Sequence, residues 1–149
     1  MKHRATASLQ VGVKTLLVNS KGQFLILKRN PAKYKGMGNL WDIPGGRIDG
    51  VGSLAQNLKR EVKEETGISR VTLISLLAAQ DIIKPGFHVI RLTYLSRVTS
   101  EKVILDNVEH TEYLWATLGD LIKTKGLDPY LKGILKDKTI TSFIKDKLK

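Results

Sequence analysis

The stretch GGRIDGVGSLAQNLKREVKEETGI, residues 45–68, decides the fold of this chain. Glu61, Glu64 and Glu65 are spaced three and four residues apart in it. In a helix of 3.6 residues per turn these carboxylates share one face, and Glu61 repels Glu65 at i,i+4. Arg60 can reach Glu64 at i+4, whereas the spacing offers Glu61 and Glu65 no basic partner. The alternative to a solvated acidic face is a divalent cation such as Mg²⁺, which selects carboxylate oxygens.

Flanking signals predict a helix over residues 54–66. Ser53 is a natural N-cap, and Gly67 is placed to end the helix at C′. An apolar stripe at i, i+4 and i+8 would bury its back against the core. The members of the stripe are Leu54, Leu58 and Val62. Before the helix, Gly45 and Gly46 suit a tight turn where backbone approaches a metal or phosphate.

This segment resembles the Nudix box, whose pattern is G, five residues, E, seven residues, then REUxEExGU, with U a bulky aliphatic residue. Gly46 opens the pattern, and the PGG of residues 44–46 leads into it. The second part is matched by Arg60, Glu61, Val62, Glu64, Glu65, Gly67 and Ile68. One defining letter is missing, because Gly52 stands where the pattern has its first glutamate.

The resemblance implies a Nudix hydrolase, in which a metal-activated water attacks phosphorus in a nucleoside diphosphate linked to another moiety. The implied cofactor is Mg²⁺ or Mn²⁺. By resemblance, Glu61 and Glu65 are direct metal ligands, and the carbonyl of Gly46 completes the shell. Glu64 is a ligand or a supporting carboxylate and a candidate base, and Arg60 would orient the array through it.

Departures from the box concern the metal site. Gly52 predicts reduced metal affinity rather than inactivity, because three glutamates of the helix remain. Asp49 is a candidate substitute for the missing carboxylate. Asn57, where the family has a small residue, would hydrogen-bond a metal-bound water or fill space.

A further carboxylate is implied outside the box, because family members often supply one from the loop before a late strand. The stretch ILDNVEHTEYLW resembles that loop, with Glu109 as the first candidate for ligand or base and Glu112 as the second. The alternative for Glu109 is a solvated loop residue. His110 is a weaker candidate to assist, because a single loop histidine is usually exposed or structural.

Substrate contacts are predicted from single residues. Arg29, at the end of a predicted strand, resembles an arginine that many relatives direct at the substrate. Trp41 would line the base pocket or pack in the core, and Tyr94 and Phe87 face the same alternative.

Composition predicts one soluble globular domain over residues 1–149, with 42% hydrophobic residues. The absence of cysteine agrees with a reducing cytoplasm, and no apolar run reaches the length of a membrane span. The predicted fold is a Nudix-type α/β/α sandwich with a central mixed sheet. Strands are expected at residues 9–18, 23–29, 40–43, 71–82, 87–98 and 111–116, and helices at 54–66, 117–124 and within 123–149.

The net charge of +11, from 25 basic and 14 acidic residues, predicts attraction to polyanions. Residues 123–149 carry eight lysines interleaved with apolar residues, which indicates one or two amphipathic helices. A solvated lysine face is favoured over a nucleic-acid or membrane surface, because no pattern of base-stacking aromatic residues accompanies it.

The leading hypothesis is an Mg²⁺-dependent pyrophosphohydrolase acting on a (d)NTP of the oxidised-nucleotide type or on ADP-ribose, with the former favoured by the short chain. Two alternatives stay open. One is a pyrophosphohydrolase of RNA 5′ ends, and the other is a catalytically weak module that binds RNA or another polyanion. A homodimer is compatible with the sequence, which specifies no interface.

Overall fold

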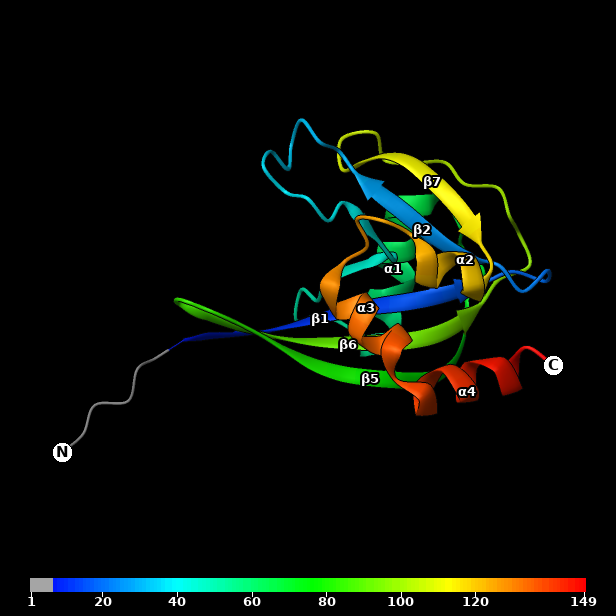
Figure 1. Cartoon of the computed structure of the whole chain (residues 1–149). Helices are drawn as coiled ribbons and strands as arrows, with labels where there is room; N and C mark the ends of the chain where they lie inside the picture. Colours follow the sequence, from blue (N-terminus) through cyan, green and yellow to red (C-terminus); the bar gives the residue numbers. More distant parts are fainter. Residues whose placement is uncertain (1–6) are drawn as a thin grey trace.

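A curled, mixed sheet forms the centre of the protein, whose residues 7–149 are described by a computed structural model (Figure 1). The elements in chain order are β1 (Ser8–Val18), β2 (Phe24–Arg29), β3 (Trp41–Asp42), β4 (Gly45–Arg47), α1 (Leu54–Thr66), β5 (Thr72–Lys84), β6 (Phe87–Arg97), β7 (His110–Ala116), α2 (Leu118–Lys123), α3 (Pro129–Lys136) and α4 (Lys138–Lys147). Within residues 7–149, no helix is long and apolar enough to cross a membrane.

The strand order is β3-β2-β1-β6-β5, with β7 paired to β2 and β4 paired to β1. β1 and β6 run parallel along their whole lengths, whereas the other paired strands are antiparallel. The strands expected at residues 9–18 and 23–29 form an antiparallel hairpin, in which Val18 pairs with Phe24. The main partner of β1 is nevertheless β6, so the sheet is mixed, as expected.

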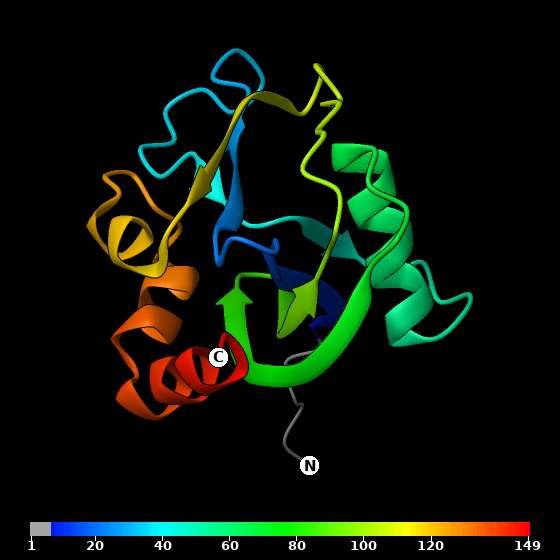
Figure 2. The same cartoon turned by 90° about the vertical axis from the view of Figure 1, so that its right-hand side faces the viewer.

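Helices cover both faces of the sheet, with α1 on one side and α2, α3 and α4 on the other (Figure 2). Leu58 and Val62 of α1 are fully buried in one core cluster together with Val13 and Leu17. The second cluster is formed by Leu16, Phe24, Leu121, Leu131 and Ile144, among others. The predicted α/β/α sandwich is confirmed, and the basic C-terminal region forms two amphipathic helices.

Helix α1 has the predicted bounds because its signals are local. The Ser53 side chain accepts a hydrogen bond from the Gln56 N–H, and the Gln56 side chain accepts one from the Ser53 N–H. Gly67 ends the helix at φ 75°. The predicted apolar stripe is wrong at Leu54, which is 38% exposed. Each step of four residues advances about 40° around a helix, so Leu54 has turned away from the buried face.

The strand β4 was not predicted. Gly45 and Gly46, expected in a tight turn, lie in a short strand that pairs antiparallel with Gly12–Lys14 of β1. A Cβ atom on Gly45 would lie 2.0 Å from the Val13 carbonyl oxygen, so only glycine fits there. The pairing brings the diglycine between β1 and α1, where backbone and glutamates meet.

The far ends of β1, β5 and β6 extend past the body of the molecule (Figure 1). This projection, residues 8–10, 82–84 and 87–89, is called the arm below. The turn at Pro85 and Gly86 joins β5 to its antiparallel partner β6. The arm forms one wall of the candidate site.

Candidate active site

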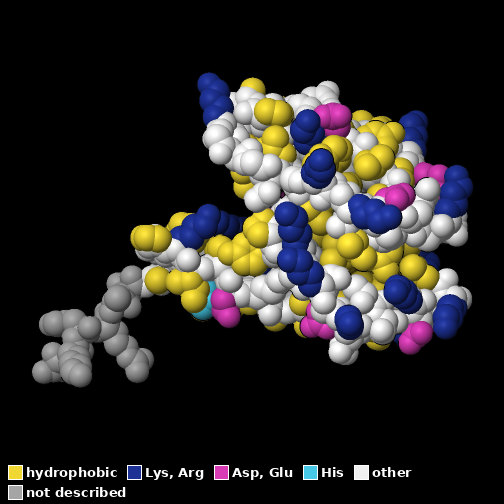
Figure 3. Space-filling view, in the orientation of Figure 1, with side chains coloured by type: hydrophobic (Ala, Val, Ile, Leu, Met, Phe, Trp, Pro, Cys, Tyr) yellow, Lys and Arg dark blue, Asp and Glu magenta, His cyan; other side chains and the backbone are white. Residues whose placement is uncertain are grey.

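A cavity of about 460 Å³ opens between the arm, β4, α1 and the loop of residues 30–39. Figure 3 shows the hollow between the arm and the body. Its acidic residues are Glu61, Glu65 and Glu109, and its basic residues are Lys14, Arg29, Arg47, Lys84 and Arg91. Gly12, Tyr34, Gly45, Gly46, Ile82, Phe87, Val89 and His110 complete the lining. The cavity therefore combines carboxylates with an excess of cations, as binding of a metal and a polyphosphate requires.

Glu61 projects from α1 onto β4. A Cβ atom on Gly46 would lie 2.7 Å from the Glu61 Oε2, so the missing side chain leaves room for this carboxylate. Burial raises the pKa of Glu61 above its ordinary value. The prediction that Glu61 lacks a basic partner is wrong, because the adjacent Arg60 places its Nη1 3.2 Å from the Glu61 Oε1.

Glu65 is the most enclosed carboxylate of the box, with 8% of the residue exposed. The Gly45 N–H donates to its Oε1 at 2.9 Å, and His110 Nε2 lies 3.5 Å from its Oε2. Burial raises the pKa of Glu65 to about 7. A buried carboxylate of this kind is stabilised by any cation that enters the cavity.

Glu64 is not among the residues that line the cavity. Its carboxylate is 57% exposed and lies 3.3 Å from Arg60 Nη1, as the i,i+4 spacing predicted. Arg60 thus bridges Glu64 and Glu61 and also donates to the Asn57 side chain at 3.0 Å. The role of Glu64 as ligand or base stays a prediction.

Asn57 anchors the loop before α1. Its Nδ2 donates to the carbonyls of Val51 and Ser53, each at 2.9 Å, and the residue is 2% exposed. It therefore binds backbone rather than pointing into the cavity. Asp49 lies 3.8 Å from the Arg60 Nε and does not line the cavity.

Gly52, which replaces the first glutamate of the box, has φ 80°. This left-handed conformation favours glycine over residues with a side chain. A Cβ atom here would also lie 2.8 Å from the Gln56 Oε1, the acceptor of the capping box. The departure from the family pattern thus coincides with a backbone that suits glycine.

Glu109 lines the cavity and is held by the loop opposite. The Tyr34 hydroxyl donates to its Oε2 at 2.6 Å, and Lys33 Nζ binds its Oε1. The hydrogen bond from Lys33, followed by that from Tyr34, lowers the pKa of Glu109. The second candidate, Glu112, lies outside the cavity and pairs with Lys28 at 3.0 Å.

His110 was expected to be exposed or structural, but it lies in the cavity beside Glu65. Burial, and next the charge of Lys14, lowers its pKa to about 4, so the ring is neutral at pH 7. Sequence reasoning named it only as a weak candidate, because a single loop histidine carries no pattern.

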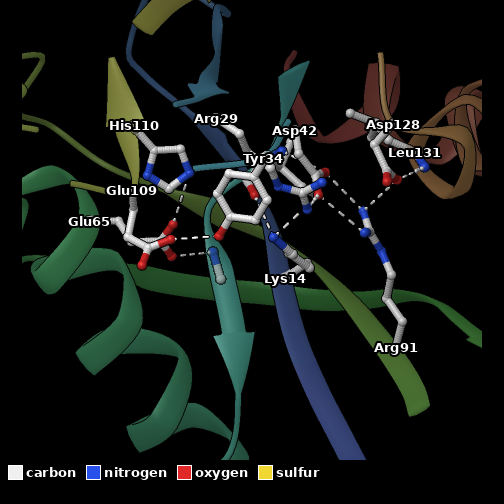
Figure 4. Close-up of polar contacts among 12 residues, drawn as sticks. Lys14, Arg29, Tyr34, Asp42, Glu65, Arg91, Glu109, His110, Asp128 and Leu131 are labelled. Carbon is white, nitrogen blue, oxygen red and sulfur yellow. Dashed lines mark hydrogen bonds and ion pairs between the residues drawn. The ribbon is translucent and has the colours of Figure 1, made fainter. Parts of the chain in front are cut away.

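A buried ion cluster forms the inner wall of the cavity (Figure 4). The carboxylate of Asp42, 2% exposed, lies 3.3 Å from Lys14, 3.0 Å from Arg29 and 3.1 Å from Arg91. Arg91 also pairs with Asp128 at 3.2 Å. Burial alone would raise the pKa of Asp42, but Lys14 and the two arginines hold it far below its ordinary value.

Of this cluster, sequence reasoning singled out only Arg29. A signal was present, because Lys14 and Arg91 stand alone inside the apolar runs VGVKTLLV and FHVIRLTYL. Lysine and arginine are seldom buried unless paired. Their partner Asp42 could not be deduced, since it lies far from both along the chain.

Two of the aromatic candidates stay outside the cavity. Trp41 packs on the core cluster around Leu16, and Tyr94 packs on the opposite cluster. Phe87 lines the cavity, with the Arg47 guanidinium carbon 5.5 Å from its ring centre. Tyr34 also lines it and was not predicted.

The cavity offers several oxygen ligands for a metal ion but no complete set of metal-binding side chains among residues 7–149. Across residues 7–149, no three His, Asp or Glu side chains converge as a complete metal site. Glu61, Glu65 and the backbone of Gly46 do offer hard oxygen donors, and the space over Gly46 is open to the Glu61 carboxylate. This donor set fits Mg²⁺, which keeps several water or phosphate ligands.

Comparison with known proteins identifies the family of this chain. The family model described as NUDIX domain matches residues 8–137. A Bacillus subtilis (strain 168) protein named "Putative 8-oxo-dGTP diphosphatase" is 27% identical over 110 residues, covering 74% of this chain and 68% of its own length.

Two further similar proteins are one much longer than this chain and one of similar length. Nudix hydrolase 8 of Arabidopsis thaliana is 28% identical over 133 residues, or 87% of this chain, which spans only 34% of that protein. The crystal structure of a MutT protein from Methanosarcina mazei Go1 superposes with a TM-score of 0.76 at 26% identity, covering 94% of this chain and 98% of the other.

Proposed function

The chain belongs to the Nudix family of hydrolases, which act on pyrophosphate bonds, and we propose that it cleaves this bond in a nucleotide with the help of Mg²⁺. The observation that carries the proposal is the position of Glu61 and Glu65 against the diglycine of β4, inside a cavity rich in cations.

The proposed ligands of the metal are Glu61, Glu65 and the carbonyl of Gly46. When bound, Mg²⁺ lowers the pKa of a water molecule and orients the phosphates. Glu64 would support this set by binding Arg60, which also contacts Glu61. Arg60 therefore acts by fixing the direction of the Glu61 carboxylate.

The cations of the cavity serve the phosphates. Lys14 and Arg29 lie on the inner wall and are 16% and 18% exposed in their side chains, so part of each faces the cavity. The positive charges of Lys14 and Arg29 would offset the negative charge of the bound diphosphate. They would also offset the negative charge that develops on the leaving group. Asp42 keeps both side chains in place.

Glu109 is the proposed second base or ligand. Its carboxylate is bound by Tyr34 and Lys33, so it reaches the substrate only after this contact opens. The other candidate base is Glu64, because Glu61 is assigned to the metal and a metal-bound carboxylate is a poor proton acceptor.

Nucleoside triphosphates, oxidised ones among them, are the first substrates to test. The name of the Bacillus subtilis relative, which aligns with 74% of this chain, supports that choice. The cavity supports it as well, because two arginines and a lysine converge on one wall, which is suited to several phosphates.

The decisive experiment is a screen of nucleoside triphosphates, ADP-ribose, nucleotide sugars and 5′-triphosphorylated RNA with Mg²⁺ or Mn²⁺. We expect release of phosphate or pyrophosphate from the triphosphates, or of a nucleoside monophosphate from ADP-ribose and the nucleotide sugars. This release should stop with EDTA and fall at least a hundredfold in Glu61→Gln. Glu101→Gln, outside the cavity, is the matched control. Salt-sensitive RNA binding without metal-dependent turnover of any substrate would instead favour a binding module.

A further inference from the structure

The three residues of β4 each contact a different side chain of the cavity, and these side chains follow one another along the strand. The first glycine of β4 donates to Glu65, and the second lies against Glu61. The third residue, Arg47, lies over the ring of Phe87 on the arm. His110 lies on the other side of Glu65, with its Nε2 3.5 Å from the Glu65 Oε2.

Glu109 precedes His110 in the chain and binds the Tyr34 hydroxyl at 2.6 Å. Tyr34 and Phe87 therefore stand at opposite ends of one cavity, with Glu65 and Glu61 between them. Along β6, Phe87 is six residues from Thr93, the partner of Lys14, which is about 20 Å at the usual rise of a strand.

The two rings have the same kind of neighbour. The Arg29 guanidinium carbon is 5.7 Å from the centre of Tyr34, and that of Arg47 is 5.5 Å from the centre of Phe87. An aromatic ring beside a guanidinium is a platform on which a nucleobase stacks. The cavity thus has two such platforms.

The charges at the two ends differ. Arg29 shares the Asp42 carboxylate, 3.0 Å away, with Lys14 and Arg91. At the arm end, neither Arg47 nor Lys84 forms an ion pair with an acidic side chain anywhere in residues 7–149. The arm end therefore combines the aromatic ring of Phe87 with two cations, Arg47 and Lys84, that have no acidic partner among the described residues.

We propose that the arm end of the cavity, formed by Phe87, Arg47 and Lys84, is a subsite for a second nucleotide unit attached beyond the cleaved diphosphate. Its base stacks on the Phe87–Arg47 platform, and Lys84 binds its phosphate. The inference rests on the proposed function, because it places the scissile diphosphate at Glu61 and Glu65. The second nucleotide belongs either to a dinucleoside polyphosphate or to the 5′ end of a triphosphorylated oligonucleotide.

Equilibrium binding tests the subsite separately from turnover. The Kd values of methylene-bridged analogues of ATP, diadenosine tetraphosphate and the triphosphorylated dinucleotide pppApA are measured by calorimetry with Mg²⁺. We expect one of the two-nucleotide ligands to bind about tenfold more tightly than the ATP analogue, as one stacked base provides. Which one gains identifies the source of the second nucleotide.

In Phe87→Leu, the two-nucleotide ligand should bind no more than threefold more tightly than the ATP analogue, because the stacking ring is lost. Leucine keeps most of the apolar volume. Lys84→Gln, on an exposed residue, should weaken binding of the two-nucleotide ligand severalfold and flatten its salt dependence. Tyr113→Leu removes an exposed ring outside the cavity and should leave the ratio unchanged.

Equal affinities for all three ligands, or an undiminished ratio in Phe87→Leu, would overturn the subsite. Turnover of ATP, 8-oxo-dGTP and the hydrolysable forms of diadenosine tetraphosphate and pppApA by the unmodified protein is measured in parallel. Turnover with equal affinities refutes the subsite alone. A binding ratio that depends on Phe87, without turnover of any ligand, supports the subsite and refutes the proposed hydrolase function.

Discussion

The Glu61 carboxylate fills the space that a side chain on Gly46 would occupy, since a Cβ atom there would lie 2.7 to 2.9 Å from its three terminal atoms. Gly46→Ala should therefore push this carboxylate aside while the backbone stays in place. We expect kcat to fall about a hundredfold, as for a catalytic group displaced by about 1 Å. Steady-state kinetics and a melting curve check this together.

Gly119→Ala is the control for that substitution, because a Cβ atom at Gly119 meets no atom within 4 Å. It lies on α2, away from the cavity, and should leave kcat unchanged. Full activity in Gly46→Ala would contradict the proposed role of Glu61.

Asp42→Asn should destabilise the protein by about 3–5 kcal/mol, because Lys14, Arg29 and Arg91 would lose their shared counter-charge in a buried place. The folded-state pKa of Asp42 is depressed, so its stabilisation is complete above the unfolded value near 4 and is lost below it. The difference in unfolding free energy between the two proteins should shrink as the pH falls from 4 to 2. Urea unfolding across this range measures it.

The control is Asp146→Asn, since Asp146 is 74% exposed in its side chain and pairs only with Lys149 at 3.7 Å. Its effect should stay within about 0.5 kcal/mol at pH 7, as for other exposed ion pairs. A similarly small effect of Asp42→Asn would mean that the cluster does not stabilise the fold.

Gly52→Ala and Gly50→Ala form a matched pair. Both glycines have φ near 80°, so either alanine costs about 1–2 kcal/mol for the left-handed conformation. Only at Gly52 does the new Cβ meet the Gln56 Oε1, which would cost about 1 kcal/mol more through the capping box. Thermal unfolding of both variants gives the difference, and equal losses would exclude this contact.

Lys33→Met should raise the pKa of Glu109 more than Tyr34→Phe does, because the Lys33 hydrogen bond is the larger of the two causes that lower it. Both variants keep the bulk of the side chain. Titration of the Glu109 carboxyl by NMR measures the shift, and an unchanged pKa in Lys33→Met would show that this pair is open in solution.

The box and its helix could be predicted because their determinants are local. Ser53, Gly67 and the glutamate spacing lie within one segment, and α1 begins and ends at the predicted residues. The strands β5, β6 and β7 were predicted within two residues at each end for the same reason, since turns and apolar runs mark them.

The inner wall of the site could not be predicted, because its contacts join distant residues. Asp42 meets Lys14 and Arg91, which are 28 and 49 positions away along the chain. Strand β4 has three residues and two glycines, so only its pairing with β1 makes it a strand. The strand propensity of individual residues does not reveal pairings between distant segments.

The parallel register of β1 and β6 has a consequence for folding. Each residue of β1 pairs with one that is synthesised 79 positions later, from Ser8 with Phe87 to Val18 with Arg97. The strand that carries Lys14 must therefore wait on the ribosome until most of the chain has emerged. Contacts of such long sequence separation slow folding, so we expect this strand pair to form late.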